Sequence, residues 1–426
     1  MSAVPTERTL PAVVVGIDTP IGLTVVRDLG QAGVPVYGIG RGVHALGMRS
    51  RYLSRGLVRP RDPDAMIDQL VHLNAELGPA CLFAVSESDI TLLNRHRERL
   101  SGFTIMFADQ ARMDSVLNKD QTYAAAAKVG IRTPRTEQPA SLAEVARLGT
   151  ELRFPVVLKW ANPHEVAARL DAAGLALDKT HYCHSAQELQ AYLAPYERAG
   201  VYPLVQEYCA GYGLGQFVLM KDGQPQYTFQ HRRVHEWPPE GGFSSMCESL
   251  PPDAHAELMA RSVALLRELR WEGIAMVEYR HDPLTGESAL MEVNGRFWGS
   301  LPLAWHAGAR FPSMMHTLWG RRQPLAAPAY RSGVRCRYML PETKRLLRIL
   351  FAPQKIADKN LHFRRLPELL GYLGGFVRPR SRYYVFTLGD AGPFFSDVGQ
   401  MLKKAWGAVG ARLPLGRRRG APASGK

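Results

Sequence analysis

The sequence predicts a chain of mixed class, α/β in its first third and α+β in its middle, followed by a basic segment. Three observations support this prediction. Short β-branched runs alternate with segments of helical apolar spacing up to about residue 110, two hairpin patterns lie between residues 215 and 297, and Lys and Arg accumulate after residue 330. Alternating strands and helices are typical of parallel sheets, whereas strands joined by tight turns indicate antiparallel ones.

The N-terminal third begins with a strand, a helix and a second strand, in the segments PAVVVGID, PIGLTVVRDLGQAG and VPVYGIGR. Residues 81–85 predict a further strand, and a helix is expected after Ser86. We therefore expect a doubly wound domain over residues 1–110. The first turn spaces Gly16 and Gly22 without the full G-x-G-x-x-G pattern, so a dinucleotide site and a simple tight turn both remain open.

The middle of the chain predicts longer helices and antiparallel strands. A helix over 119–129 ends at Gly130, one apolar strand ends near Lys159, and another ends at Glu207. A hairpin follows with Asp222-Gly223 as its turn, and a second hairpin turns at DPLTG.

The last strand of the second hairpin, in ALMEVNGRF, has a polar face. Alternate residues share a face of a strand, so Glu292, Asn294 and Arg296 are expected to point the same way. Glu278 on the partner strand is expected to lie beside Glu292. Clustered hard oxygen ligands suit Mg²⁺ held together with nucleotide phosphates. The alternative is a solvated polar edge.

In this order, the motifs resemble those of the ATP-grasp enzymes over roughly residues 10–325. The resemblance implies a Rossmann-like pre-ATP-grasp domain at 1–110 and a two-lobed ATP-grasp domain at 111–325. It implies ATP with Mg²⁺ or Mn²⁺ as cofactors. By this resemblance the metal ligands are Glu278, Glu292 and Asn294, the catalytic contact to the phosphate or acyl group is Arg296, the phosphate-binding lysines are Lys119 and Lys159, and the adenine-binding hinge is Gln206, Glu207 and Tyr208.

Two segments depart from the pattern or extend it. The loop after Lys159, where the family places a glycine-rich lid, offers only Gly174, and Lys179 is a candidate replacement phosphate ligand. The segment HRRVHEWPPEGGFSSMCES resembles the acceptor-side loop of D-aspartate-ligase-type enzymes. It offers Arg232 or Arg233 for a substrate carboxylate and Gly241 and Gly242 for close backbone approach, while His231 and His235 have no partner readable from the sequence.

The resemblance implies a magnesium-dependent carboxylate–amine ligase that forms an acyl phosphate and releases ADP, with a small-molecule carboxylate and an amine as substrates. Biotin carboxylase chemistry is not expected, because FWGSLPLA lacks the acidic continuation that this family places after its arginine. Two alternatives remain open, an ATP-binding scaffold with weak catalysis and an NAD-linked enzyme built on the N-terminal unit.

The C-terminal extension, residues 326–426, carries most of the excess charge. Residues 331–426 hold 20 of the 53 Lys and Arg but only five of the 39 Asp and Glu, so the first 330 residues are nearly neutral. The segment resembles a basic amphipathic helix that binds an anionic membrane surface, where each basic residue contributes about 1 kcal/mol. A solvated tail is the alternative, and no nucleic-acid partner is expected.

The remaining expectations concern location and assembly. No apolar run long enough to span a membrane and no secretory signal is present, so we expect a cytoplasmic protein, peripheral on the inner membrane face if the extension binds lipid. The five scattered cysteines predict buried thiols rather than disulfides or a zinc site. A homodimer remains open.

Overall fold

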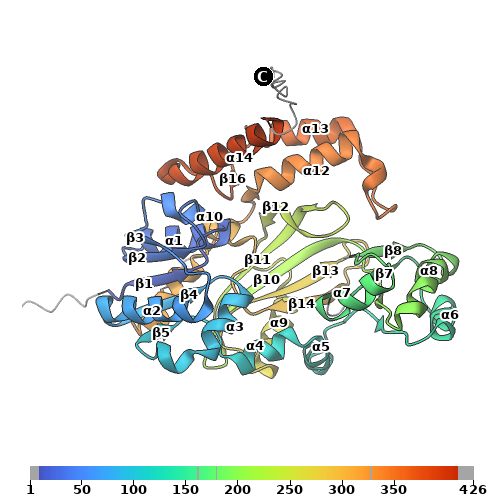
Figure 1. Ribbon diagram of the computed structural model, residues 1–426, viewed down its shortest axis with the longest axis horizontal. Helices are drawn as coiled ribbons and strands as arrows, with labels where there is room; N and C mark the ends of the chain where they lie inside the picture. Colours follow the sequence, from blue (N-terminus) through green and yellow to red (C-terminus); the bar gives the residue numbers. More distant parts are fainter. Residues whose placement is uncertain (1–8, 161–162, 179, 327–328, 411–426) are drawn as a thin grey trace, which may run out of the picture.

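The computed structural model describes residues 9–160, 163–178, 180–326 and 329–410, and three sheets organise this part of the chain (Figure 1). A parallel sheet of five strands contains the N-terminal residues, and an antiparallel sheet of four strands builds a separate lobe. A sheet of seven strands lies between them. The mixed class predicted from the sequence, with one parallel sheet and antiparallel hairpins, is confirmed.

The parallel sheet has the strand order β3-β2-β1-β4-β5 and is buried on both faces. In its central strand, Ala12 and Val14 face the core that includes α1, whereas Val13 and Val15 face the core of α2 and α3. Burial on both sides explains the continuous β-branched run. The elements are β1 (Ala12–Val15), α1 (Pro20–Gln31), β2 (Val36–Gly40), β3 (Arg55–Val58), α2 (Pro63–Leu77), β4 (Ala80–Ala84), α3 (Glu87–Arg95) and β5 (Phe103–Ile105).

The turn between β1 and α1 is tight, and its two glycines approach each other closely. A Cβ at Gly22 would lie 2.2 Å from the carbonyl oxygen of Gly16, so only glycine allows this approach. Thr19 caps the N-terminus of α1 by accepting from the amide of Gly22. The spacing of the two glycines is therefore accounted for by the tight turn.

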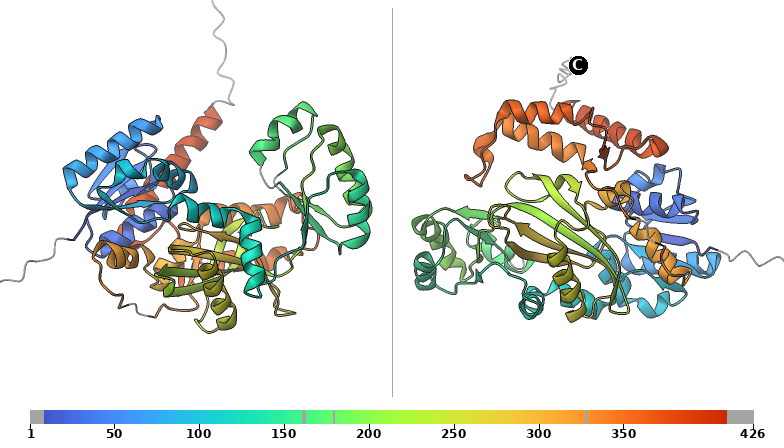
Figure 2. Two further views of the ribbon diagram at one scale, coloured as in Figure 1. Left: turned by 90° about the horizontal axis from the view of Figure 1, so that it is seen from below. Right: turned by 180° about the vertical axis from the view of Figure 1, so that it is seen from behind.

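The four-stranded sheet, of order β6-β9-β7-β8, has its own core and stands to one side of the molecule (Figure 2, left). Helices α6 and α8 pack on it through Val145, Leu148, Leu189 and Leu193. Two helices, α4 (Gln110–Leu117) and α5 (Lys119–Lys128), precede it. The lobe contains β6 (Thr136–Glu137), α6 (Leu142–Glu151), β7 (Val156–Lys159), α7 (Pro163–Ala172), β8 (His181–Cys183), α8 (Ala186–Leu193) and β9 (Leu204–Glu207).

The seven-stranded sheet has the order β14-β13-β10-β11-β12-β15-β16 and contains both predicted hairpins. The first turns at Asp222 and Gly223, whose φ angles of 51° and 68° are those that a two-residue hairpin turn requires. Helix α9 packs on one face, and α10 and α11 on the other. These elements are β10 (Tyr212–Lys221), β11 (Gln224–Trp237), β12 (Phe243–Ser249), α9 (Ala256–Glu268), β13 (Gly273–His281), β14 (Ser288–Asn294), α10 (Leu301–Ala307) and α11 (Phe311–Met315).

The described part of the C-terminal extension is built into the protein rather than left as a solvated tail. Strands β15 (Arg335–Arg337) and β16 (Ser381–Tyr383) complete the seven-stranded sheet. Helices α12 (Met339–Phe351), α13 (Arg365–Gly374) and α14 (Gly392–Gly410) form an outer layer on one side (Figure 1). Strands of three residues carry too little pattern to be recognised in a sequence. In the described ranges, no helix combines the length and apolarity needed to cross a bilayer.

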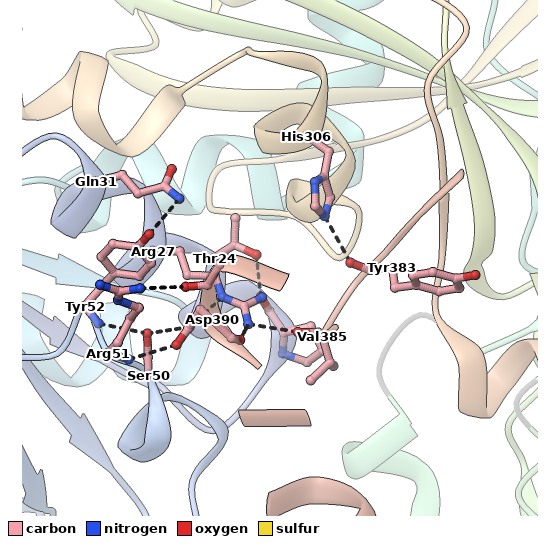
Figure 3. Close-up of polar contacts among 12 residues, drawn as sticks. Thr24, Arg27, Gln31, Ser50, Arg51, Tyr52, His306, Tyr383, Val385 and Asp390 are labelled. Atoms are coloured by element: carbon pink, nitrogen blue, oxygen red, sulfur yellow. Dashed lines mark hydrogen bonds and ion pairs between the residues drawn. The ribbon is translucent and has the colours of Figure 1, made fainter. Parts of the chain in front are cut away.

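A buried ion pair fastens this extension to the N-terminal domain (Figure 3). Asp390 accepts hydrogen bonds from Arg27 Nε at 2.9 Å, Ser50 Oγ at 2.7 Å and the amide of Arg51 at 2.8 Å. Arg27 also donates to the carbonyl of Val385. Four of the five cysteines are buried thiols, as predicted, whereas Cys209 is half-buried.

Candidate functional site

A cavity of about 370 Å³ opens between the four-stranded sheet and the end of the seven-stranded sheet that carries β13 and β14. Its volume falls in the range of roughly 300–1,000 Å³ usual for small-ligand pockets. Strands β7 and β9 line one wall, and β11, β13 and β14 line the other. The cavity brings together the following residues named from the sequence: Lys119, Lys159, Gln206, Glu207, Tyr208, Arg233, Gly241, Gly242, Glu278 and Glu292.

Two carboxylates face the cavity from adjacent strands. Glu278 on β13 is the direct register partner of Glu292 on β14, as the hairpin pattern predicts. Burial, together with the charges of Glu292 and Glu236, raises the pKa of Glu278 to about 7, although Arg233 acts in the opposite direction. The amide nitrogen of Asn294 donates to Glu292 Oε1 at 2.9 Å. Carboxylate and amide oxygens are thus concentrated in this part of the cavity.

Two lysines also line this cavity. Lys119 is the first residue of α5, directly after the capping Asn118, and Lys159 is the last residue of β7. Burial, with a smaller contribution from the Lys119 charge, lowers the pKa of Lys159 to about 8. Within the described residues neither lysine forms an ion pair with Glu278 or Glu292, so an anionic ligand in the cavity would meet two available cations.

The two adjacent arginines of β11 lie on opposite faces of the strand. Arg233 points into the cavity and pairs with Glu278 at 2.5 Å and Glu236 at 3.2 Å. Arg232 points away and pairs with Glu248 at 2.8 Å. Of the two arginines named as substrate ligands, Arg232 therefore lies outside the cavity, and the charge of Arg233 is already balanced by protein carboxylates.

The segment named as the adenine hinge lines the cavity and is held by polar contacts. Gln206 donates to Thr136 Oγ1 at 2.7 Å, and Glu207 pairs with Arg132. Tyr208 donates to Asp358 Oδ2 at 2.9 Å. Asp358 belongs to the C-terminal extension, which therefore touches the candidate site.

Arg296 and Asn294 line a neighbouring hollow of about 250 Å³, which shares Lys119 and Glu292 with the main cavity. The hydrogen-bonded part of β14 ends at Asn294, but the alternation continues, because Glu292, Asn294 and Arg296 are accessible whereas Val293, Gly295 and Phe297 are buried. Arg296 pairs with Glu87 of α3 at 2.8 Å. Glu292, Asn294 and Arg296 therefore share one side of the chain, as the alternation predicts, and an acid of α3 holds Arg296 there.

The acceptor-side glycines border the cavity where β11 turns toward β12. Gly241 has φ 134°, and a Cβ at Gly242 would lie 2.2 Å from the carbonyl oxygen of Trp237. Tyr182 of the opposite lobe donates to the carbonyl of Glu240 at 2.5 Å and joins this loop to β8. Only glycine fits the tight turn at Gly242 without displacing the backbone.

The lid segment after Lys159 is partly helical. Helix α7 occupies Pro163–Ala172, and Gly174 follows it with φ 66°. Lys179, the candidate replacement ligand, lies outside the described residues.

Several cavity residues were not recognised in the sequence, among them Tyr182, Glu236 and Arg280. Arg280 stands two residues after Glu278 on the same strand, so alternation could have found it. His235, which has no partner readable from the sequence, contacts Glu342 Oε1 at 2.6 Å. This contact joins β11 to α12, which lies more than 100 residues further along the chain.

A wider hollow of about 670 Å³ lies near α9 and the turn between β13 and β14. Its charged groups are engaged at the surface: Arg261 pairs with Glu257, and Arg132 pairs with Glu207 and Glu287. It lacks the facing lysines and glutamates of the first cavity, which we take as the candidate site.

No protein-family model and no curated protein matches the chain. Solved structures do match. They include an L-amino acid ligase from Bacillus licheniformis, with 15% identity, 74% of this chain and 75% of that chain covered, and a TM-score of 0.53. The ADP complex of PurK, N5-carboxyaminoimidazole ribonucleotide synthetase, matches with 14% identity, 79% and 84% coverage and a TM-score of 0.59.

The biotin carboxylase domain dimer of Hydrogenobacter thermophilus 2-oxoglutarate carboxylase, in complex with MgADP, matches with 14% identity, 77% and 74% coverage and a TM-score of 0.57. At such identities a likeness describes the fold. The chain therefore shares the fold of these three enzymes.

Proposed function

We propose that the protein is an ATP-dependent ligase that activates a carboxylate as an acyl phosphate and joins it to an amine. The observation that carries this proposal is the cavity in which Lys119 and Lys159 face the register-paired Glu278 and Glu292. The fold supports it, because PurK and the Hydrogenobacter domain share this fold and were solved with ADP or MgADP.

The donor set suits Mg²⁺ only in company with a nucleotide. Among the described residues, no three His, Cys, Asp or Glu side chains come together as a metal site. Mg²⁺ is usually held by one or two carboxylates plus substrate phosphates, and Glu278 and Glu292 would supply the carboxylates, with Asn294 beside them. When bound, the metal would neutralise the charge that develops on the transferred phosphoryl group.

Other residues would bind the phosphates and exclude water during the two steps of the reaction. Lys119 and Lys159 would hold the β- and γ-phosphates while an oxygen of the substrate carboxylate attacks the γ-phosphorus and ADP leaves. An amine nitrogen would then attack the acyl carbon of the acyl phosphate, and phosphate would leave. Acyl phosphates hydrolyse readily, so the lid segment around α7 would serve to exclude water.

The alternative of an ATP-binding scaffold has one observation in its favour. Arg233 pairs with Glu278, a proposed metal ligand, so this carboxylate is already neutralised by the protein. The NAD-linked alternative has less support, since Gly16 and Gly22 are explained by the tight turn.

The test is release of ADP and phosphate from Mg-ATP by the full chain, measured against pools of carboxylic acids combined with pools of amines. We expect turnover that requires both an acid and an amine and falls on the order of 100-fold or more in Glu292→Ala. The matched control is Glu257→Ala, at an exposed glutamate outside the cavity, which should keep full activity. ATP binding without turnover in any pool would favour the scaffold, and equal activity in Glu292→Ala would refute the metal assignment.

A further inference from the structure

We propose that the outer helical layer, formed by α12, α13, α14 and the residues between α13 and α14, docks the protein on an anionic lipid bilayer. The proposal concerns a surface outside the candidate site and does not depend on the ligase reaction. Figure 1 shows the three helices as the outermost layer on one side of the molecule, and Figure 2, right, shows the same layer from behind.

Each helix of the layer exposes large apolar side chains at helical spacing. On α13, Leu366, Leu370 and Leu373 follow the i, i+4, i+7 pattern of one face, with Leu366 64% exposed. On α12, Leu340, Leu347 and Phe351 follow i, i+7, i+11, again on one face. The layer also exposes Phe376, Val377, Leu388, Phe395, Met401 and Leu402. Such a collection is far more than the scattered apolar residues of an ordinary surface.

The charges of the same layer have one sign. All five acidic residues between 339 and 403 are buried or half-buried: Glu342, Asp358, Glu368, Asp390 and Asp397. The exposed charged side chains of the layer, over its residues up to 403, are all Lys or Arg: Lys344, Arg365, Arg378, Arg380 and Lys403. Exposed leucine and phenylalanine among Lys and Arg is the composition of helices that lie in the interface of anionic membranes.

Hydrogen bonds, strand pairing and an ion pair hold the inner side of the layer against the rest of the protein. A small rotation of the helices therefore cannot bury the exposed apolar side chains. Glu342 on the inner face of α12 accepts from Ser245 Oγ at 2.7 Å and contacts His235. Strands β15 and β16 are paired in the sheet, and Asp390 is buried against Arg27. The inner side of the layer is thus held by these internal contacts, and the opposite side, which carries the apolar side chains, is left exposed.

Charge decides between a bilayer and a second copy of the chain. A two-fold symmetric interface brings the same patch of both copies together, so the cations listed above would face one another without exposed acids to balance them. An anionic bilayer complements both the charge and the apolar stripes, and attracts basic segments over about a Debye length.

The experiment is flotation of the full chain with vesicles of phosphatidylcholine alone or of phosphatidylcholine and phosphatidylglycerol at about 7:3. We expect binding to the mixed vesicles and little to the neutral ones. The double substitution Leu366→Glu and Leu370→Glu should weaken binding at least roughly tenfold, because two apolar anchors become anions. Arg365→Ala should weaken it about fivefold.

Matched controls lie elsewhere on the surface. Leu284→Glu changes a leucine that is 93% exposed in the turn between β13 and β14, and Arg61→Ala removes an exposed cation before α2. Both variants should bind like the parent. Since the variants keep the whole chain, residues 411–426 contribute equally to every comparison.

Equal binding to neutral and anionic vesicles, no binding to either, or a loss in Leu284→Glu as large as in the α13 variant would overturn the proposal. A parent dimer that the α13 substitutions convert to a monomer, without vesicle binding, would also overturn it and assign the layer to a second copy. Should the double variant fail to unfold cooperatively, the comparison of Arg365→Ala with Arg61→Ala decides the question.

Discussion

Arg233 joins two carboxylates of the cavity, those of Glu236 and Glu278, through ion pairs. Burial disfavours its charged form, but the Glu278 and Glu236 carboxylates outweigh burial and raise its pKa. A guanidinium that is only 14% exposed and pairs with two carboxylates contributes to the geometry of the site as much as to its charge. It is therefore a residue that positions Glu278.

Replacing Arg233 by Ala should destabilise the protein by about 3–5 kcal/mol, because the buried Glu278 loses its paired cation and Glu236 keeps only Arg280. The neighbouring Arg232→Ala is the matched control. Its ion pair with Glu248 is largely exposed on the arginine side, so its loss should cost less than about 1 kcal/mol. Denaturant unfolding of the two variants measures the difference, and equal losses would contradict the assignment of the two arginines to opposite faces.

The burial of His231 predicts that the free energy of unfolding falls in acid. Burial lowers the pKa of this histidine to about 3, and neither ring nitrogen has a hydrogen-bond partner in the described structure. Because the folded pKa lies below the unfolded value of 6.5, its contribution to stability is present above pH 6.5 and declines as pH falls from there toward 3. At pH 5 the loss should be about 2 kcal/mol.

Unfolding of His231→Phe at pH 7 and pH 5 tests this expectation. The substitution should reduce the difference between the two pH values by about 2 kcal/mol, whereas His72→Phe, at an exposed position on α2, should leave it unchanged. An unchanged pH dependence in His231→Phe would show that another group titrates in this window.

At the scale of elements, the hairpin of β13 and β14 shows what local pattern predicts well. A short turn fixes the register of two antiparallel strands, so Glu278 and Glu292 are placed opposite each other by information within 15 residues. The end of β14 was not predictable, because the alternation of the sequence continues past Asn294 while the hydrogen-bonded ladder does not. The alternation thus predicts the side on which Arg296 lies, but its pairing with Glu87 required the structure.

The Arg27–Asp390 ion pair, called the clasp below, joins α1 to the C-terminal extension, and no local sequence pattern predicts it. Its partners, Arg27 and Asp390, are more than 360 residues apart and 1% and 2% exposed. Asp390→Ala leaves Arg27 buried without its anion and should cost about 3–5 kcal/mol. Glu76→Ala breaks the exposed pair with Arg55 and should cost under about 1 kcal/mol, so denaturant unfolding that gives equal losses would contradict the clasp.

At the scale of the whole molecule, the site forms where the four-stranded and seven-stranded sheets face each other. The sequence predicts some of its residues and misses others. The order of motifs predicts the ATP-grasp fold and the lysines and glutamates around one cavity. It does not show that Asp358 reaches Tyr208 or that β15 and β16 extend the sheet, because these contacts depend on three-residue strands and long-range packing.

The central claim is that this cavity binds a magnesium nucleotide, and the substrates need not be known to test it. The most direct measurement is titration calorimetry of the full chain with Mg²⁺ and a non-hydrolysable ATP analogue. We predict saturable binding that Lys159→Ala weakens roughly 10- to 100-fold, since one charged hydrogen bond to phosphate is lost, and that Lys128→Ala, at an exposed lysine on α5, leaves unchanged. Absence of binding, or equal binding by Lys159→Ala, would contradict the account.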